Sequence, residues 1–81
     1  MKALVYVSFK KTVLDPQGQT IRKALVGMGH HSIAEVRQGK VFEIDLAPGT
    51  ERKQAEAEIS QIANDVLANP VIEEYRVEIV D

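Results

Sequence analysis

Hydrophobic and polar residues alternate along the first segment of the chain, from Lys2 to Phe9. Alternation with a period of two, in a run rich in β-branched and aromatic residues, predicts a β-strand. Both faces of this strand carry apolar side chains, so one apolar set must point away from whatever covers the other. The two sets are Ala3, Val5, Val7 and Phe9 on one face, and Leu4, Tyr6 and Ser8 on the other.

A helix is predicted from about Pro16 to Met28. Asp15 can cap the free amide of Gly18, and proline fits the first helical position because no N–H is needed there. Gly29 stands where a helix end favours a left-handed residue. The predicted apolar stripe has helical spacing and consists of Ile21, Ala24, Leu25 and Met28.

The stretch from Ser32 to Leu46 contains Gly39 between two extended runs, which predicts two strands joined by a short turn at Gln38-Gly39. A second helix is expected after Thr50, its predicted cap, and should end at Asn69-Pro70. The last run, with Tyr75, Val77 and Ile79 on one face, predicts a final strand. The apolar stripe of the second helix is Ala55, Ile59, Ile62, Ala63, Val66 and Leu67.

The predicted element order, βαββαβ, indicates an α+β ferredoxin-like sandwich in a single domain spanning residues 1–81. In that fold two helices cover one face of a four-stranded antiparallel sheet, and the other face stays open. Apolar residues on the open face, with Leu4 and Tyr6 as candidates, favour a homodimer or a dimer of dimers, although single exposed apolar residues are also ordinary. The side chains expected between helices and sheet are Ile21, Leu25, Ile59, Ile62 and Val66.

Composition narrows the classes of partner. The 81 residues include ten basic and twelve acidic ones, for a net charge of −2. This balance gives no electrostatic basis for binding nucleic acid or an anionic membrane. The chain has no cysteine, and its start resembles neither a signal peptide nor a membrane span, so we expect a cytoplasmic protein.

Residues that could carry chemistry are few. His30 and His31 are adjacent, so their side chains diverge and do not converge on one metal. Glu73 and Glu74 point apart on a strand, which makes them poor acid/base partners. No phosphate-binding glycine loop is present, and we assign no catalytic, cofactor-binding or metal-binding residue. Gly18 in a first helical turn indicates either close approach of another backbone or simply an easier entry into the helix.

Three stretches of the sequence resemble the PurS family, the small subunits of phosphoribosylformylglycinamidine synthase in purine biosynthesis. They are Val13 to Gly18 with Thr20-Ile21 and Ala24-Leu25, Val36 to Lys40 with Phe42-Glu43, and Leu67 to Tyr75, so the resemblance runs nearly from end to end. It implies a subunit without an active site of its own, which joins a glutaminase subunit to a synthetase subunit and supports ammonia transfer between them. It also implies that this chain binds no cofactor, and that ATP, magnesium and glutamine are used by the partner subunits.

The positions that carry the resemblance and that core packing explains least are the candidate partner interface. They are Asp15, Pro16, Gln17, Gly18, Arg37, Gly39, Lys40, Asn69, Pro70, Glu73 and Tyr75. Two alternatives stay open from the residues alone: a stand-alone dimeric module that binds a small regulatory molecule, and a small acyl-phosphate hydrolase, which would need an anion-holding arginine in an early loop. Here the first strand is followed by Lys10 and Lys11.

Overall fold

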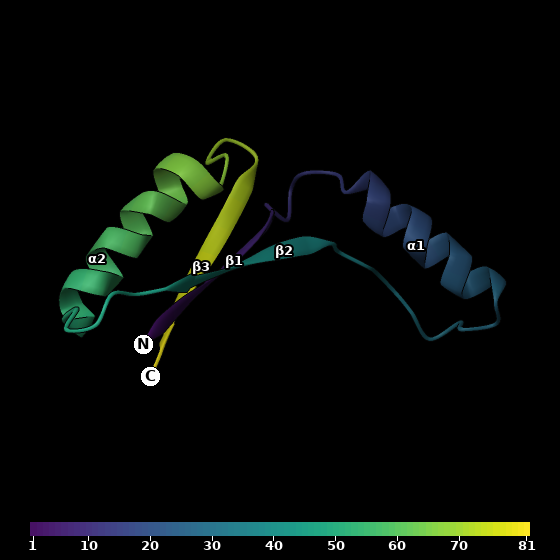
Figure 1. Cartoon of the computed structure of the whole chain (residues 1–81). Helices are drawn as coiled ribbons and strands as arrows, with labels where there is room; N and C mark the ends of the chain where they lie inside the picture. The colour runs from purple at the N-terminus through teal and green to yellow at the C-terminus, as the bar shows by residue number, and fades with distance from the viewer.

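The computed structural model describes all 81 residues as three strands and two helices, the second of which ends in a π-helical turn (Figure 1). In chain order the elements are β1 (Lys2–Phe9), α1 (Pro16–Gly27), β2 (Gly39–Asp45), α2 (Arg52–Ile62), the π-helical turn (Ala63–Leu67) and β3 (Glu73–Val80). Neither helix is long and apolar enough to cross a membrane.

The three strands form an antiparallel sheet in the order β2-β1-β3. Val5 lies opposite Phe42 on β2 and Val77 on β3, and Tyr6 lies opposite Val41 and Arg76. Ala3, Val5 and Val7 are buried on one face of β1, and Val77 and Ile79 of β3 pack against the same core, so the predicted alternation of the first and last strands is confirmed.

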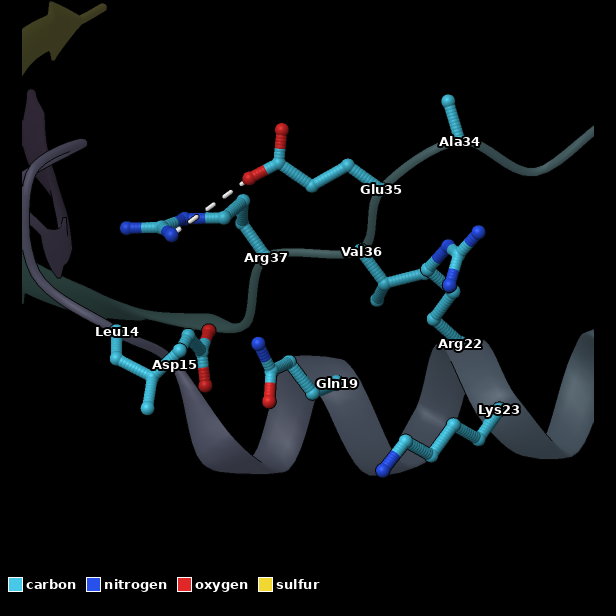
Figure 2. Close-up of a pocket in the computed structure, with 9 residues that line it drawn as sticks. All are labelled: Leu14, Asp15, Gln19, Arg22, Lys23, Ala34, Glu35, Val36 and Arg37. Carbon is cyan, nitrogen blue, oxygen red and sulfur yellow. Dashed lines mark ion pairs between the residues drawn. The ribbon is translucent and has the colours of Figure 1, made fainter.

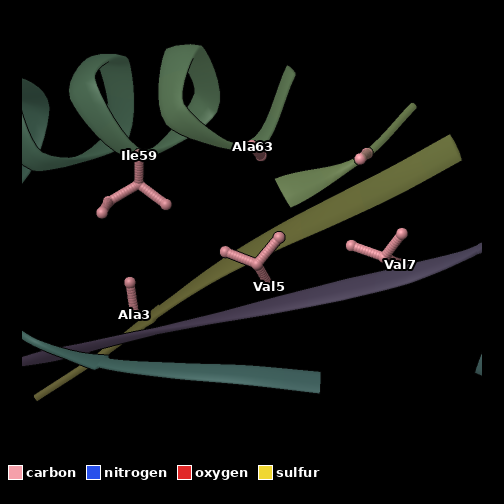
Figure 3. Packing of buried hydrophobic residues seen from close by; sticks show 6 residues of the cluster. Ala3, Val5, Val7, Ile59 and Ala63 are labelled. Atoms are coloured by element: carbon pink, nitrogen blue, oxygen red, sulfur yellow. The ribbon is translucent and has the colours of Figure 1, made fainter. Parts of the chain in front are cut away.

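The hydrophobic core lies between this sheet and α2 (Figure 3). Val5 and Val7 are almost fully buried against Ile59 and Ala63, and α2 contacts β3 directly. The predicted cap of this helix is wrong: Thr50 instead donates its hydroxyl to the carbonyl of Ala47 at 2.6 Å, and Glu51 precedes the first turn. The core is small, because most of its members are alanine or valine.

The predicted fourth strand is absent, so the four-stranded sheet is corrected to three strands. Residues 32–38 lie outside any sheet, and only Gly39–Asp45 pairs with β1. The two-residue turns that suit a hairpin require a positive φ, but only Gly29 and Gly49 have one. Gln38 also uses its N–H in a bond to the side chain of Asp15, so no hairpin turn forms at Gln38-Gly39.

Helix α1 stands apart from the sheet, so only α2 covers its inner face, which corrects the expected pair of helices (Figure 1). The predicted limits of α1, its Asp15 cap and the left-handed Gly29 are confirmed. Its predicted burial is wrong: Ile21 is 40% exposed and Leu25 is half-exposed outside the core. Of the residues expected inside from α2, Ile59 is buried, Ile62 is partly buried and Val66 is 74% exposed in the π-helical turn.

The molecule is consequently elongated, with extents of 51 × 26 × 14 Å. We call residues 10–38, which leave the sheet after β1 and return at β2, the arm. The arm base is the place where residues 10–18 meet residues 36–38.

Candidate functional site

The three stretches that carry the resemblance meet at the arm base. A shallow hollow of about 220 Å³ takes Asp15 and Gln17 from the first stretch, Gly39 and Lys40 from the second, and Glu73 from the third. The end of β1 and Gln38 complete its lining. Segments far apart in the sequence therefore form one continuous surface at one end of the sheet.

Asp15 holds the two ends of the arm together. Its carboxylate is buried and accepts an N–H bond from Gly18 at 2.9 Å and another from Gln38 at 2.7 Å. The Gln38 and Gly18 N–H groups, aided by the nearby positive charge of Arg37, hold the pKa of Asp15 below its usual range, although partial desolvation opposes them. One oxygen of the ionised carboxylate, Oδ1, thus caps α1, and the other, Oδ2, holds the residue that precedes β2.

Gly18 and Gly39 allow backbones to approach closely at the arm base. A Cβ on Gly18 would collide with the carbonyl oxygen of Val36. A Cβ on Gly39 would lie 2.7 Å from the carbonyl oxygen of Val7. Of the two interpretations of Gly18, close approach of another backbone is the one that the structure supports.

Arg37 makes a second connection across the arm base. One guanidinium nitrogen donates to the carbonyl of Lys10 at 2.8 Å and to that of Val13 at 3.0 Å. Glu35 lies 3.6 Å from the same guanidinium (Figure 2). Two backbone carbonyls of the outgoing chain are thereby tied to the returning chain, so Arg37 has a structural task in addition to any contact with a partner.

The third stretch is a compact turn next to the arm base. The Asn69 side chain accepts the N–H of Val71 at 3.1 Å, while its backbone N–H donates to the Glu73 carboxylate at 2.7 Å. The Lys10 N–H donates to the Ile72 carbonyl at 2.9 Å. The backbone of Lys10 therefore links this turn to Arg37, because its N–H bonds to Ile72 and its carbonyl accepts from the Arg37 guanidinium.

The structure separates the remaining predicted interface residues from this hollow. Pro16 lies in the exposed first turn of α1, where it lines a different, wider hollow with Thr20 and Ile21. Pro70 is exposed in the turn, and Tyr75, 36% exposed, belongs to the edge strand β3. Sequence reasoning missed Gln38, because it contributes a backbone N–H, which no side-chain pattern signals.

A further hollow of about 450 Å³ lies between α1 and the returning part of the arm. Figure 2 shows Gln19 and Arg22 of the helix directed toward the segment from Ala34 to Arg37, with Val36 pointing toward α1, and Lys23 lying across the helix at the edge of the hollow. The helix and this segment therefore form one layered unit, and the lining is mostly polar.

The open face of the sheet carries the two self-association candidates. Leu4 and Tyr6 are half-buried, and the guanidinium of Arg76 lies 4.1 Å from the centre of the Tyr6 ring. Glu78 accepts the Tyr6 hydroxyl at 3.3 Å. This face is thus a small apolar centre with charged side chains around it.

The side chains at these sites supply hydrogen-bond donors, acceptors and exposed charges. No three histidine, cysteine or acidic side chains gather where they could hold a metal ion. The arm base has a fixed geometry, because it contains the buried carboxylate of Asp15, the arginine bonded to two carbonyls and the two closely packed glycines. Three residues lie at its rim, namely Gln17, Lys40 and Glu73. The fold defines a small α+β domain with a projecting arm.

Comparison with known proteins identifies the family. The family described as PurS, phosphoribosylformylglycinamidine (FGAM) synthase, matches residues 2–81, and the chain belongs to this family. It is 41% identical over 76 residues to the PurS subunit of Mycobacterium leprae, covering 94% of this chain and 91% of the relative. Identity to the PurS subunit of Archaeoglobus fulgidus is 40% over 77 residues, with 95% of each chain covered.

Solved structures share the whole fold. The crystal structure of PurS from Bacillus subtilis superposes with a TM-score of 0.85 at 36% identity, covering 99% of this chain and 98% of that one. A chain in the structure of PurLQS from Thermotoga maritima superposes with a TM-score of 0.86 at 26% identity, covering 98% of this chain and 95% of that one. The α+β class and the resemblance inferred from the sequence are therefore confirmed.

Proposed function

We propose that this chain is the small, non-catalytic subunit of the phosphoribosylformylglycinamidine synthase complex of purine biosynthesis. In this role it holds a glutaminase subunit against a synthetase subunit, so that ammonia released by the first reaches the second. The observation that carries the proposal is membership of the PurS family over residues 2–81, together with a fold that matches a chain of the PurLQS structure.

The arm base is the proposed contact surface for the partner subunits. It unites the three stretches of resemblance, and its buried bonds fix the positions of the exposed residues at its rim. A rigid surface loses little conformational entropy on binding, which suits a subunit that must keep two larger proteins in register. Ammonia would otherwise escape to water, so fixed geometry raises the rate without any chemical group from this chain.

We further propose that ATP, magnesium and glutamine are used by the partner subunits, and that the complex works in the cytoplasm. The free protein forms a homodimer or a dimer of dimers in this proposal. The apolar centre of the open sheet face, with Leu4 and Tyr6, is a candidate surface for pairing.

Reconstitution tests the bridging role. Synthetase and glutaminase are mixed with ATP, magnesium and substrate, with either glutamine or an ammonium salt as nitrogen source, and this chain is added or left out. We expect glutamine-dependent turnover to require the chain and ammonia-dependent turnover to proceed without it. Full glutamine-dependent activity in its absence would contradict the proposal.

Lys40→Glu tests the contact surface, because Lys40 lies at the rim of the hollow and is exposed. We expect this variant to lower glutamine-dependent turnover about tenfold or more at limiting concentration, which corresponds to a loss of ~1.4 kcal/mol of binding. Lys53→Glu, on an exposed position of α2, is the matched control and should behave as wild type. Equal activity of the two variants would remove this part of the surface from the interface.

A further inference from the structure

Charge is distributed unevenly between the arm and the rest of the chain. The arm, residues 10–38, carries five lysines and arginines and two acidic residues, whereas the remaining residues carry five lysines and arginines and ten acidic residues. The small net charge of the whole chain therefore conceals a positive arm attached to a negative sheet and α2. A local excess of positive charge attracts anions, so the arm is the part of the molecule that suits an anion best.

The hollow between α1 and residues 34–37 lies within this positive arm. Its volume of about 450 Å³ falls in the range of small-molecule sites, which is roughly 300–1,000 Å³. Gln19, Arg22 and Lys23 have the spacing i, i+3 and i+4, so they are neighbours on one face of α1. Leu14 and Val36 give the same hollow an apolar wall. The hollow thus combines hydrogen-bond donors and positive charge with apolar contact area.

Both carboxylates that line this hollow are already engaged within the chain. Asp15 accepts a backbone N–H with each of its two oxygens, and Glu35 lies 3.6 Å from the Arg37 guanidinium. Arg22 and Lys23, in contrast, are exposed, and neither side chain takes part in an ion pair of the structure. Single unpaired cations are common on protein surfaces, but here two of them border one hollow whose acidic groups are occupied.

We propose that this hollow binds the phosphate group of a small molecule, either free phosphate or a phosphate ester. The guanidinium of Arg22 presents several N–H donors in one plane, which matches the oxygens of a phosphate. Lys23 lies at the edge of the hollow, and its flexible stem lets the ammonium group reach the same anion (Figure 2). The Gln19 amide adds a neutral donor, and the apolar part of an ester contacts Leu14 and Val36.

A small anion fits this site better than a long polyanion such as nucleic acid. The ten acidic residues outside the arm repel a chain of phosphates, whereas a single phosphate group in the hollow stays within the positive arm. Phosphate binding by the arm goes beyond the bridging role and does not depend on it. It is therefore tested with this chain alone, so its failure is distinguishable from failure of the bridging role.

Titration of the whole chain with inorganic phosphate, followed through its amide NMR signals, tests the site. The pH is held constant, and chloride keeps the ionic strength constant and low, because salt screens exposed charges. We expect the signals of Gln19, Arg22 and Val36 to shift and saturate, with a dissociation constant of about 1 mM. Absence of saturable shifts up to ~20 mM phosphate would overturn the proposal.

Three charge-removing variants separate the hollow from a general attraction to the arm. Arg22→Gln and Lys23→Gln should each raise the dissociation constant at least about fivefold, because each removes one cation from the hollow. Lys11→Gln is the matched control: it removes the same charge from an exposed position of the arm outside the hollow and should leave the constant within about twofold. Equal constants for all three variants, whether weakened or unchanged, would overturn the site. The remaining amide signals report whether each variant is folded.

Adenosine monophosphate and adenosine distinguish the two sources of the phosphate group. A dissociation constant for adenosine monophosphate at least about tenfold below that for inorganic phosphate supports a phosphate ester as the ligand, and Leu14→Ala should then weaken only the ester. Equal constants for the ester and inorganic phosphate support free phosphate. Adenosine that binds as tightly as adenosine monophosphate would overturn the proposal, because the phosphate group would then contribute nothing.

Discussion

Gly18→Ala isolates the packing of the arm base from ordinary helix propensity. Alanine is the better helix former by about 1 kcal/mol, so propensity alone predicts a more stable arm. The added methyl group, however, would collide with the backbone carbonyl of Val36, which cannot rotate away as a side chain could. Forcing extra volume into a packed site costs about 1–3 kcal/mol, so we expect a net loss of up to about 2 kcal/mol in the local stability of the arm.

Gly27→Ala is the matched control within the same helix. A Cβ at Gly27 meets no atom within 4 Å, and the residue does not have a positive φ. There the substitution should stabilise α1 by about 0.4–1 kcal/mol. Native-state hydrogen exchange of the α1 amides measures both variants, since each factor of ten in exchange rate corresponds to ~1.4 kcal/mol. Equal or higher protection of α1 in Gly18→Ala than in Gly27→Ala would refute the close approach.

Two further predictions concern the core and the arm base. Ile59→Ala should lower the free energy of unfolding by about 2–5 kcal/mol in chemical denaturation. Val66→Ala, at a position 74% exposed, should change it by less than about 0.5 kcal/mol. Similar losses in the two variants would contradict the core as described. Because the folded-state pKa of Asp15 lies below its ordinary value of 3.8, its contribution to stability should be complete above that value and disappear as the pH falls through the lower folded-state pKa. The amide signals of Gly18 and Gln38 should titrate together with that midpoint in NMR, and a midpoint at or above the ordinary value would contradict the two bonds.

Local signals in the sequence predicted the individual elements well. The alternation from Lys2 to Phe9, the Asp15 cap and the left-handed Gly29 depend on neighbours within a few residues, and all three are found in the structure. The hairpin at Gln38-Gly39 was wrong for a reason that local patterns do not contain. The Gln38 N–H is taken by a carboxylate 23 positions earlier in the chain.

The candidate site was predicted as residues but not as an arrangement. Asp15, Gly39, Lys40 and Glu73 line one hollow, although nothing in their spacing places them together. Arg37 was expected to face a partner, which stays a prediction, and the structure adds that its guanidinium is bonded to two carbonyls of its own chain. The type of a side chain shows which groups it can bind. Only the fold shows which of those groups lie close enough for it to contact.

The error over α1 shows what an amphipathic pattern can and cannot establish. The apolar spacing of Ile21, Leu25 and Met28 correctly indicates that one side of the helix is made for burial, since such a stripe is unfavourable in water. The pattern does not say which molecule supplies the covering surface. In one chain the arm base holds α1 away from the only sheet available (Figure 1). The sequence pattern therefore predicts four strands and two packed helices, whereas the single chain forms three strands under one helix and leaves the stripe of α1 exposed.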